Sequence, residues 1–394
     1  MTPGGGAARP YDEIVLGLGV MGSAAAWHLA RRGRRVLAVD AHAPGHRLGA
    51  SHGHTRIIRK AYFEDPAYVP LLDRAYQLWD ELARETGAAL LQPTGGLMLG
   101  PPEAPVIAGA LRSARAHDLP YELLTAREVR RRFPAFTPDD GVAGLWEPQA
   151  GILFPERCVR ALQQGAERAG AELRFEEPVR AWQADGSRAI VETSRGRYEA
   201  DTLVIAAGPW APSVLARLGL PLEVFRQVAC WFEPARPEDA ASLAPDRCPL
   251  FIGMIDGVHL YGLPGAAGPG FKVAIHDTGE WSDPCTPETV RRDVAPEEVE
   301  AVRRLLRRLL PGLDGPLVAA ETCLYTMTPD AHFVIDRSAG HPRLVYAAGF
   351  SGHGFKFGGV VGEILADLAT AGRTAHPISF LSAERFREAR PAPA

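Results

Sequence analysis

Two of the most informative side chains in this sequence are lysines, because the chain otherwise uses arginine as its cation. Only three of the 43 lysine and arginine residues are lysines, namely Lys60, Lys272 and Lys356. A compact ammonium and a planar guanidinium are not interchangeable, so a lysine here can mark a place that requires a point charge. Lys272 stands between apolar residues in an expected strand. The alternative is that three lysines survive by chance.

A second candidate group is the segment 51–59, SHGHTRIIR, which contains Arg56 and Arg59. Two guanidinium groups three residues apart on one side of a turn could bind a carboxylate through paired hydrogen bonds. The alternative interpretation is a basic surface loop in which His52 and His54 are incidental.

Two further segments hold a cysteine and the third lysine. Cys323, in ETCLYTMTP, is by itself typical of a buried, unreactive cysteine. Lys356 lies in the glycine-rich loop 349–359, GFSGHGFKFGG, between an apolar strand and an amphipathic helix. The N-terminus of that helix could stabilise negative charge that develops on a cofactor.

The stretch 11–40 predicts the scaffold that positions these groups, a strand, a turn, a helix and a second strand. Gly17 permits a sharp turn, Gly19 lets the backbone approach a pyrophosphate, and Gly22 lets the helix pack against the strand. The helix N-terminus favours phosphate, and Asp40 stands where a carboxylate binds a ribose diol. The motif predicts a dinucleotide site but does not choose between FAD and NAD(P).

Two later apolar strands also end in glycine, one at Gly208 and one at Gly349. In a doubly wound sheet the carboxyl ends of the strands form the ligand crevice. We therefore expect all three strands to reach one cofactor, with the intervening segments inserted between parts of one domain.

The predicted fold is an α/β protein with a Rossmann-like dinucleotide-binding domain, discontinuous in sequence, and a second α+β domain on a largely antiparallel sheet. A chain of 394 residues is long for one core, which supports two joined domains. The predicted ranges are 11–90, 151–221 and 323–385 for the cofactor domain, 91–150 and 222–322 for the substrate domain, and 1–10 and 386–394 for flexible tails.

Composition argues against several classes of protein. A net charge of −4 and a pI near 6.3 argue against nucleic acid as a partner. No apolar run approaches the roughly 20 residues of a membrane helix, and the N-terminus lacks the apolar region of a secretory signal. Five cysteines without a C-x-x-C pair argue against a disulfide framework or a metal site. Because this cysteine usage suits a reducing compartment and the C-terminal PAPA is not a peroxisomal signal, we expect a cytoplasmic protein. We also expect a monomer.

Three segments together carry a family resemblance: HGHTRIIRKAY, ETCLYTMTPDAHFVID and AAGFSGHGFKFGGVVGE. They resemble the monomeric sarcosine oxidase and N-methyl-tryptophan oxidase family, in the D-amino-acid-oxidase-like group of flavoproteins. The resemblance extends from Tyr11 to about Phe380. It implies FAD as the cofactor, joined covalently to the cysteine that matches Cys323.

The resemblance also implies roles for individual residues. Arg59 and Lys356 match the pair that binds the substrate carboxylate, and Lys272 matches the lysine that activates oxygen beside the flavin. Other matches to the lining of the flavin and substrate cavity are Arg56, His52, Tyr261, His276 and Tyr325. Gly352 and Gly354, with Lys356, are expected to contact the cofactor. Lys60 has no such match and is expected to be structural.

The implied activity is oxidation of a secondary amino acid, N-methyl or cyclic, by FAD and molecular oxygen. The imine product hydrolyses and oxygen becomes hydrogen peroxide. His54 replaces an acid of the family, and the segment 251–260, FIGMIDGVHL, keeps little of the family's sequence. Sarcosine, a bulkier N-methyl amino acid and a cyclic imino acid such as pipecolate or proline therefore all remain open as substrates.

Three alternatives are weighed against this hypothesis. A flavin dehydrogenase would pass electrons to a carrier other than oxygen, and Lys272 argues against it. An RNA-modifying flavoprotein of the same fold would need a basic face, against which the net charge of −4 argues. A non-catalytic flavoprotein would have no reason to retain Arg59, Lys272, Cys323 and Lys356 together.

Overall fold

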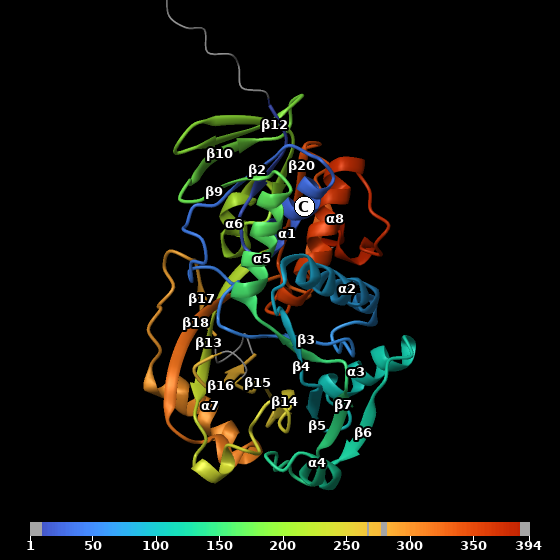
Figure 1. The fold of residues 1–394 in the computed structure, drawn as a ribbon, viewed down its shortest axis with the longest axis vertical. Coiled ribbons are helices and arrows are strands. Elements are labelled where there is room, and N and C mark those ends of the chain that lie inside the picture. The colour runs from blue at the N-terminus through green and yellow to red at the C-terminus, as the bar shows by residue number, and fades with distance from the viewer. Residues whose placement is uncertain (1–9, 266–267, 277–281, 387–394) are drawn as a thin grey trace, which may run out of the picture.

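The computed structural model describes residues 10–265, 268–276 and 282–386, and it has two lobes, each built on one large sheet (Figure 1). The predicted terminal tails lie outside the described residues except for Pro10 and Phe386. Among the described residues, no helix has the length and apolar composition to cross a bilayer.

The sheet of the upper lobe has eight strands, with β10-β11-β12-β1-β2-β9 in order and with β20 beside β12 and β19 beside β20. Its strands are β1 (Tyr11–Leu16), β2 (Val36–Val39), β9 (Glu172–Arg174), β10 (Val179–Gln183), β11 (Ala189–Thr193), β12 (Arg197–Ile205), β19 (Val334–Arg337) and β20 (Leu344–Ala348). β1, β12 and β20 are parallel neighbours, with Leu16 opposite Ile205 and Ile205 opposite Tyr346. The prediction that the three glycine-ended strands meet at one edge is confirmed.

Helices cover this sheet and bury its apolar strands. They are α1 (Val20–Arg31), α2 (Val69–Thr86), α5 (Pro155–Arg168), the short α6 (Ala211–Val214) and α8 (Gly358–Ala371). α1 is buried from Val20 to Ala30 because its alanines let α8 approach closely. A Cβ on Gly362 of α8 would lie 2.4 Å from the Cβ of Ala24. Small residues on both helices therefore set the position of the α8 N-terminus relative to the β1–α1 turn.

The sheet of the lower lobe has nine strands and is antiparallel except where β14 pairs with β5. Its strands are β5 (Gly96–Gly100), β6 (Glu122–Thr125), β7 (Ala143–Glu147), β13 (Glu223–Phe232), β14 (Leu250–Ile255), β15 (Val258–Leu263), β16 (Phe271–Ile275), β17 (Pro284–Cys285) and β18 (Leu317–Met327). Its helices are α3 (Pro105–Ala116), α4 (Ala126–Arg132) and α7 (Pro296–Leu309). The apolar face of α7, including Val302, Leu306 and Leu309, is buried in this lobe's core.

A three-stranded sheet of β3 (Arg56–Ile58), β4 (Leu91–Pro93) and β8 (Gly151–Leu153) lies between the lobes (Figure 1). Short 3₁₀ helices complete the chain: η1 (Pro66–Tyr68), η2 (Gly208–Trp210), η3 (Ala216–Leu218), η4 (Pro237–Asp239), η5 (Pro311–Leu313), η6 (Phe355–Phe357), η7 (Ser379–Leu381) and η8 (Ala383–Phe386). The proposed domain boundary at 322/323 falls inside β18, which pairs along β13 in the lower sheet. Sequence patterns did not predict β10.

Candidate active site

One cavity of about 630 Å³ is lined by residues of both lobes. The predicted site residues that line it are Gly17, Gly19, Asp40, His52, Arg56, Arg59, Gly208, Tyr261, Lys272, His276, Cys323, Tyr325, Gly352, Gly354 and Lys356. Gly22 lies beneath this surface, and a Cβ there would come within 1.8 Å of the Gly17 carbonyl oxygen. Its absent side chain therefore permits helix packing, as expected.

The end of the cavity at the β1–α1 turn has the shape expected for a dinucleotide. Gly17 has a φ of 95°, and a Cβ there would lie 2.5 Å from the Ala206 carbonyl oxygen, so the turn requires glycine. Asp40 follows β2, and its two carboxylate oxygens accept hydrogen bonds from Leu18 N at 2.7 Å and His42 N at 2.9 Å. The carboxylate thus braces the turn from which the helix N-terminus faces the cavity.

Lys272 is a buried cation that lines the cavity. It is 3% exposed, and its Nζ donates to the carbonyl oxygens of Gly53 at 3.1 Å and Thr55 at 3.3 Å. Its Nζ also lies 5.3 Å from the centre of the Trp231 ring, its cross-strand partner. Burial, followed by the Arg56 guanidinium, lowers the pKa of Lys272 to about 7.

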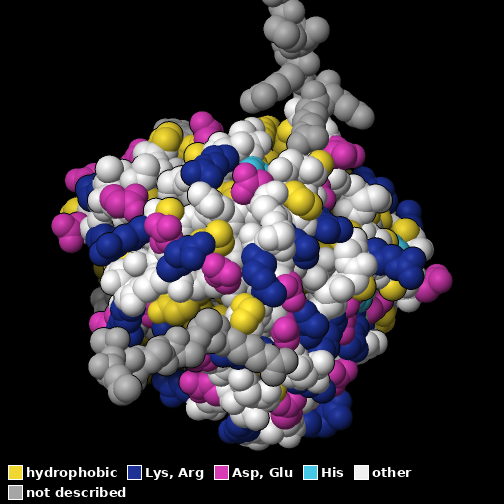
Figure 2. Space-filling model, turned by 90° about the horizontal axis from the view of Figure 1, so that it is seen from above, with side chains coloured by type: hydrophobic (Ala, Val, Ile, Leu, Met, Phe, Trp, Pro, Cys, Tyr) yellow, Lys and Arg dark blue, Asp and Glu magenta, His cyan; other side chains and the backbone are white. Residues whose placement is uncertain are grey.

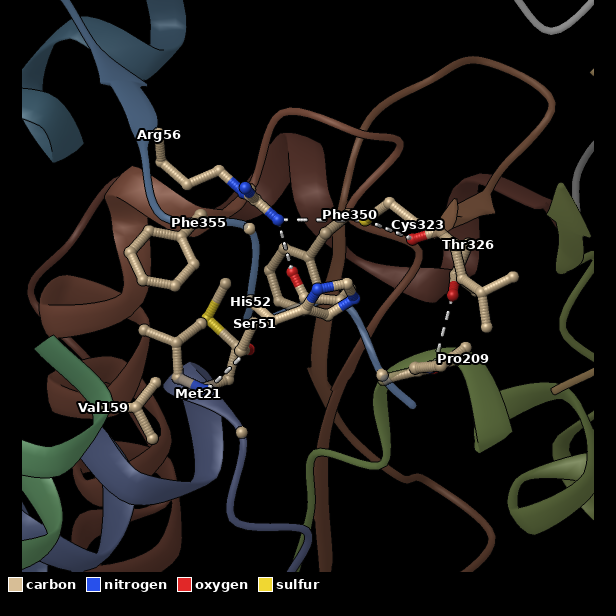
Figure 3. Close-up of a pocket in the computed structure, with 18 of the residues that line it drawn as sticks. Met21, Ser51, His52, Arg56, Val159, Pro209, Cys323, Thr326, Phe350 and Phe355 are labelled. Carbon is tan, nitrogen blue, oxygen red and sulfur yellow. Dashed lines mark hydrogen bonds between the residues drawn. The ribbon is translucent and has the colours of Figure 1, made fainter. Parts of the chain in front are cut away.

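Arg56 and Cys323 approach each other directly across the cavity, and the His52 ring lies beside the line that joins them (Figure 3). Arg56 donates to the carbonyl oxygens of Thr55 at 2.9 Å and Ala50 at 3.0 Å, and its Nη2 lies 3.8 Å from the Cys323 Sγ. Burial, followed by Arg56, lowers the pKa of His52 to about 3, so His52 is neutral. Neither ring nitrogen of His52 has a hydrogen-bond partner among the described residues, which leaves both available to a bound group.

Arg59 and Lys356 form a second cationic centre in the same cavity. Arg59 is 2% exposed, and its Nη2 lies 2.8 and 2.6 Å from the two carboxylate oxygens of Glu64. Lys356 donates to the His353 carbonyl oxygen at 2.6 Å and to the Tyr62 hydroxyl at 3.4 Å. Burial, followed by Arg59, lowers the pKa of Lys356 to about 7. The two arginines of segment 51–59 therefore do not act as the single pair that their spacing suggested.

Aromatic residues and imidazoles line the space near this second centre. His276 Nδ1 lies 2.9 Å from the Tyr325 hydroxyl, and burial lowers the pKa of His276 to about 4. Burial also raises the pKa of Tyr325 and of Tyr261. A Cβ on Gly352 would lie 2.5 Å from Tyr325 Cε2, so this loop glycine lets the backbone pass directly over the ring pair. At neutral pH these polar groups are uncharged hydrogen-bonding groups.

The comparisons with known proteins agree with this geometry. The sequence profile of the family described as FAD dependent oxidoreductase matches residues 12–368. Monomeric sarcosine oxidase from Streptomyces avermitilis is 48% identical over 383 residues, which cover 96% of this chain and 98% of the relative. The chain belongs to this family of FAD-dependent oxidoreductases. Its cofactor is FAD. Membership of the family thus decides between FAD and NAD(P), which the motif of the β1–α1 turn alone does not.

Further relatives of the family have related activities in their names. N-methyl-L-tryptophan oxidase from Yersinia pestis is 36% identical over 378 residues, 96% of this chain and the whole of the relative. Among solved structures, NikD, described as an unusual amino acid oxidase essential for nikkomycin biosynthesis, has a TM-score of 0.82 at 27% identity and covers 95% of this chain and 98% of its own. L-proline dehydrogenase from P. horikoshii has a TM-score of 0.83 at 25% identity, covering 97% and 99%.

The residues of this family member fit FAD, although the structure contains no ligand. Gly17 and the start of α1, where Val20 N donates to Ser51 Oγ at 3.1 Å, line the cavity at the β1–α1 turn. The ring nitrogens of His52 line the same cavity and have no hydrogen-bond partner among the described residues. Arg59 Nε is a further buried nitrogen without a partner in the described residues. The cavity therefore offers polar contacts that the protein alone does not satisfy.

Sequence reasoning missed several side chains that this family member places around the cations. Glu64 follows Arg59 by only five residues. An acidic residue so close to this arginine was the signal by which the sequence could have indicated an ion pair. Glu156 lies in the first turn of α5, and it lines the cavity together with Trp231 and His353. Lys60, by contrast, forms an ion pair with Asp73 at 2.7 Å and does not line the cavity. His54 packs edge-on against Trp231, with ring centres 5.8 Å apart.

Proposed function

We propose that this enzyme is an FAD-dependent oxidase of a secondary amino acid, N-methyl or cyclic, acting on a CH–NH bond. The observation that carries the proposal is the presence of two cationic centres on one cavity, Arg59 with Lys356, which are both buried, and the buried Lys272 with the half-buried Arg56. FAD supplies the chemistry that takes a hydride equivalent from the carbon beside the nitrogen and passes the electrons on.

Arg59 and Lys356 are proposed to hold the substrate carboxylate. A carboxylate placed between a guanidinium and an ammonium is fixed in orientation, which presents the neighbouring C–H bond in one direction. The positive surroundings also favour the neutral form of the substrate amine, because a like charge disfavours protonation. The amine can give up a hydride equivalent only in that neutral form. Tyr261, His276 and Tyr325 would bound the substrate as uncharged groups.

Arg56, His52 and Cys323 are proposed to contact the flavin, with Cys323 as the covalent attachment site. The half-buried Cys323 lines the cavity, and its Sγ lies 3.8 Å from Nη2 of Arg56, so the thiol is accessible from the space that the flavin would occupy. Gly17, Gly19, Asp40, Gly208, Gly352 and Gly354 would contact FAD along the rest of the cavity. In this proposal the upper lobe holds the cofactor and the lower lobe supplies much of the substrate surroundings.

Lys272 is proposed to promote the reaction with oxygen, whose product would be hydrogen peroxide. A buried ammonium stabilises negative charge at close range because little water screens it. The structural likeness to L-proline dehydrogenase favours a second candidate, in which a carrier replaces oxygen as the electron acceptor.

We also propose a cytoplasmic monomer. On the face seen in Figure 2, basic and acidic side chains of the described residues are interspersed.

The test has two parts. The purified protein should be yellow, and its colour should remain with the chain after acid precipitation. N-methyl and cyclic amino acids, from sarcosine to N-methyl-tryptophan, proline and pipecolate, should then be screened for peroxide formation and, in parallel, for reduction of an artificial carrier without oxygen. Peroxide at a rate close to that of carrier reduction supports the oxidase. Carrier reduction without peroxide would establish the dehydrogenase instead.

A further inference from the structure

The carboxylate of Glu156 anchors the loop that faces Lys272. Glu156 lies in the first turn of α5, and its Oε1 accepts hydrogen bonds from two successive amides, Gly53 N at 2.7 Å and His54 N at 3.1 Å. Both residues have left-handed backbone, with φ of 102° and 64°. Successive amides in such turns form a concavity that binds anions. Because this conformation is strained for a residue other than glycine, the Glu156 contact stabilises a shape that His54 disfavours.

A single peptide group links this carboxylate to the lysine. The amide of the Gly53–His54 peptide donates to Glu156, and the carbonyl of the same peptide accepts from Lys272 Nζ at 3.1 Å. The space is tight, since a Cβ on Gly53 would lie 3.4 Å from that Nζ. Rotation of the peptide would break both hydrogen bonds together, so the two side chains fix its orientation jointly.

The charges around Lys272 come from several elements. Arg56 lies on β3, His52 on the preceding loop, Cys323 and Glu321 on β18, and Glu156 on α5. Arg56 disfavours the ammonium form, whereas the two glutamates favour it. Glu321 is paired with Arg47 at 2.8 Å, while Glu156 is bound to backbone amides. Burial alone would raise the pKa of Glu156, but these amides lower it, so the charge is retained.

We infer that Glu156 is the positioning residue of Lys272. Through the Gly53–His54 peptide it fixes the acceptor of the Lys272 ammonium, and its negative charge offsets that of Arg56. The consequence for oxygen rests on the proposed function, whereas the placement and protonation of Lys272 do not. Glu156 makes no hydrogen bond to the ammonium itself, and it acts through the Gly53–His54 peptide and through its charge.

The scarcity of lysine allows a direct measurement on the purified flavoprotein. Labelling with lysine carrying ¹³C at the ε position gives signals from Lys60, Lys272 and Lys356 alone, assigned with the three lysine variants. In Glu156→Gln the Lys272 signal should titrate at least about 0.5 pH units lower than in the parent, because a negative charge is removed while an acceptor oxygen remains. Glu156→Asp, which keeps the charge, should titrate closer to the parent.

The matched control is Glu147→Gln. Glu147 is buried and, like Glu156, accepts hydrogen bonds from two successive amides, which are Lys60 N at 2.6 Å and Ala61 N at 3.0 Å. It is not among the strongest electrostatic influences on Lys272, so its variant should leave the Lys272 titration nearly unchanged. An unshifted Lys272 signal in Glu156→Gln, or an equal shift in Glu147→Gln, overturns the inference.

The pH dependence of the reaction with oxygen supplies the second readout. In Glu156→Gln it should shift in the same direction and by the same amount as the Lys272 signal. A shifted signal with an unshifted oxygen reaction would support the role of Glu156 and contradict that of Lys272 in the proposed function. Failure of the inference about Glu156 and failure of the proposed role of Lys272 therefore give different results.

Discussion

Arg59 directs one nitrogen, Nη2, at both carboxylate oxygens of Glu64, at 2.8 and 2.6 Å, within the cavity that also contains Lys356. Burial alone would raise the pKa of Glu64, but Arg59, His353 and Lys356 together lower it to about 2. One carboxylate thus balances two buried cations when no substrate carboxylate is present. Its charge sets how strongly those cations attract a second carboxylate.

Removal of Arg59 should separate stability from binding. Arg59→Met leaves the largely buried carboxylate of Glu64, whose side chain is 17% exposed, without its main partner and should cost about 3 kcal/mol of unfolding free energy. The double variant Arg59→Met/Glu64→Gln should recover most of that stability, because neither charge remains. Both should bind substrate at least about 10-fold more weakly, since a charge-assisted contact is lost. Denaturant titration and substrate KM measure the two effects, and recovery of binding in the double variant would contradict the proposed role of Arg59.

Replacement of Lys272 should affect only the reaction with oxygen. Lys272→Met removes the buried ammonium and should slow reoxidation of the reduced flavin by about 100-fold or more, with flavin reduction nearly unchanged. Anaerobic and aerobic stopped-flow measurements separate the two half-reactions. Lys60→Met, which removes a lysine paired with Asp73 outside the cavity, is the control and should change neither. Normal reoxidation in Lys272→Met would favour the dehydrogenase.

Carboxylate binding should weaken with rising pH. Because Lys356 has its pKa lowered to about 7, its ammonium is present below pH 7 and is lost above it. The affinity for an unreactive carboxylate such as acetate should therefore fall as pH rises from 6 to 9, by up to about tenfold per pH unit above the pKa. Spectral titration of the flavin gives the Kd. In Lys356→Met the dependence should disappear, and its persistence would assign the titration to another group.

The attachment of FAD should depend on one thiol. In Cys323→Ser the yellow colour should pass into the supernatant on acid precipitation, because a hydroxyl is a far weaker nucleophile than a thiolate. Cys285→Ser provides a matched control, since Cys285 is also half-buried but does not line the cavity. Retention of colour in Cys323→Ser would move the attachment to another residue.

Gly352 should be essential because its loop packs directly against the rings of Tyr325 and His276. Gly352 has a φ of 77°, and a Cβ there would lie 2.5 Å from Tyr325 and 2.8 Å from His276. Gly352→Ala should therefore raise the substrate KM and lower stability. Gly170→Ala carries similar backbone strain, with a φ of 96°, but meets no atom within 4 Å. It should lower stability by about 1 kcal/mol and leave KM unchanged.

The sequence by itself determined the local elements and the general chemistry. The run from Gly17 to Asp40 predicted a dinucleotide turn with its helix, and the amphipathic pattern after the loop 349–359 predicted the helix that is α8, because these features depend on neighbours in the chain. Glycines at three strand ends correctly predicted that β1, β12 and β20 meet at one edge. The three segments that resemble the family predicted FAD as the cofactor and predicted which charged residues line the cavity.

Only the tertiary structure decided how those charges are partnered. Arg56 and Arg59 are three residues apart, yet one contacts Cys323 and the other Glu64. Glu156 and Lys272 are far apart in sequence, yet both form hydrogen bonds with the same peptide group, between Gly53 and His54. Burial depends on packing between distant segments, and burial is what lowers the pKa of both lysines that line the cavity. The sequence could therefore name the cations, but their partners and their protonation arise only when the two lobes close around one cavity.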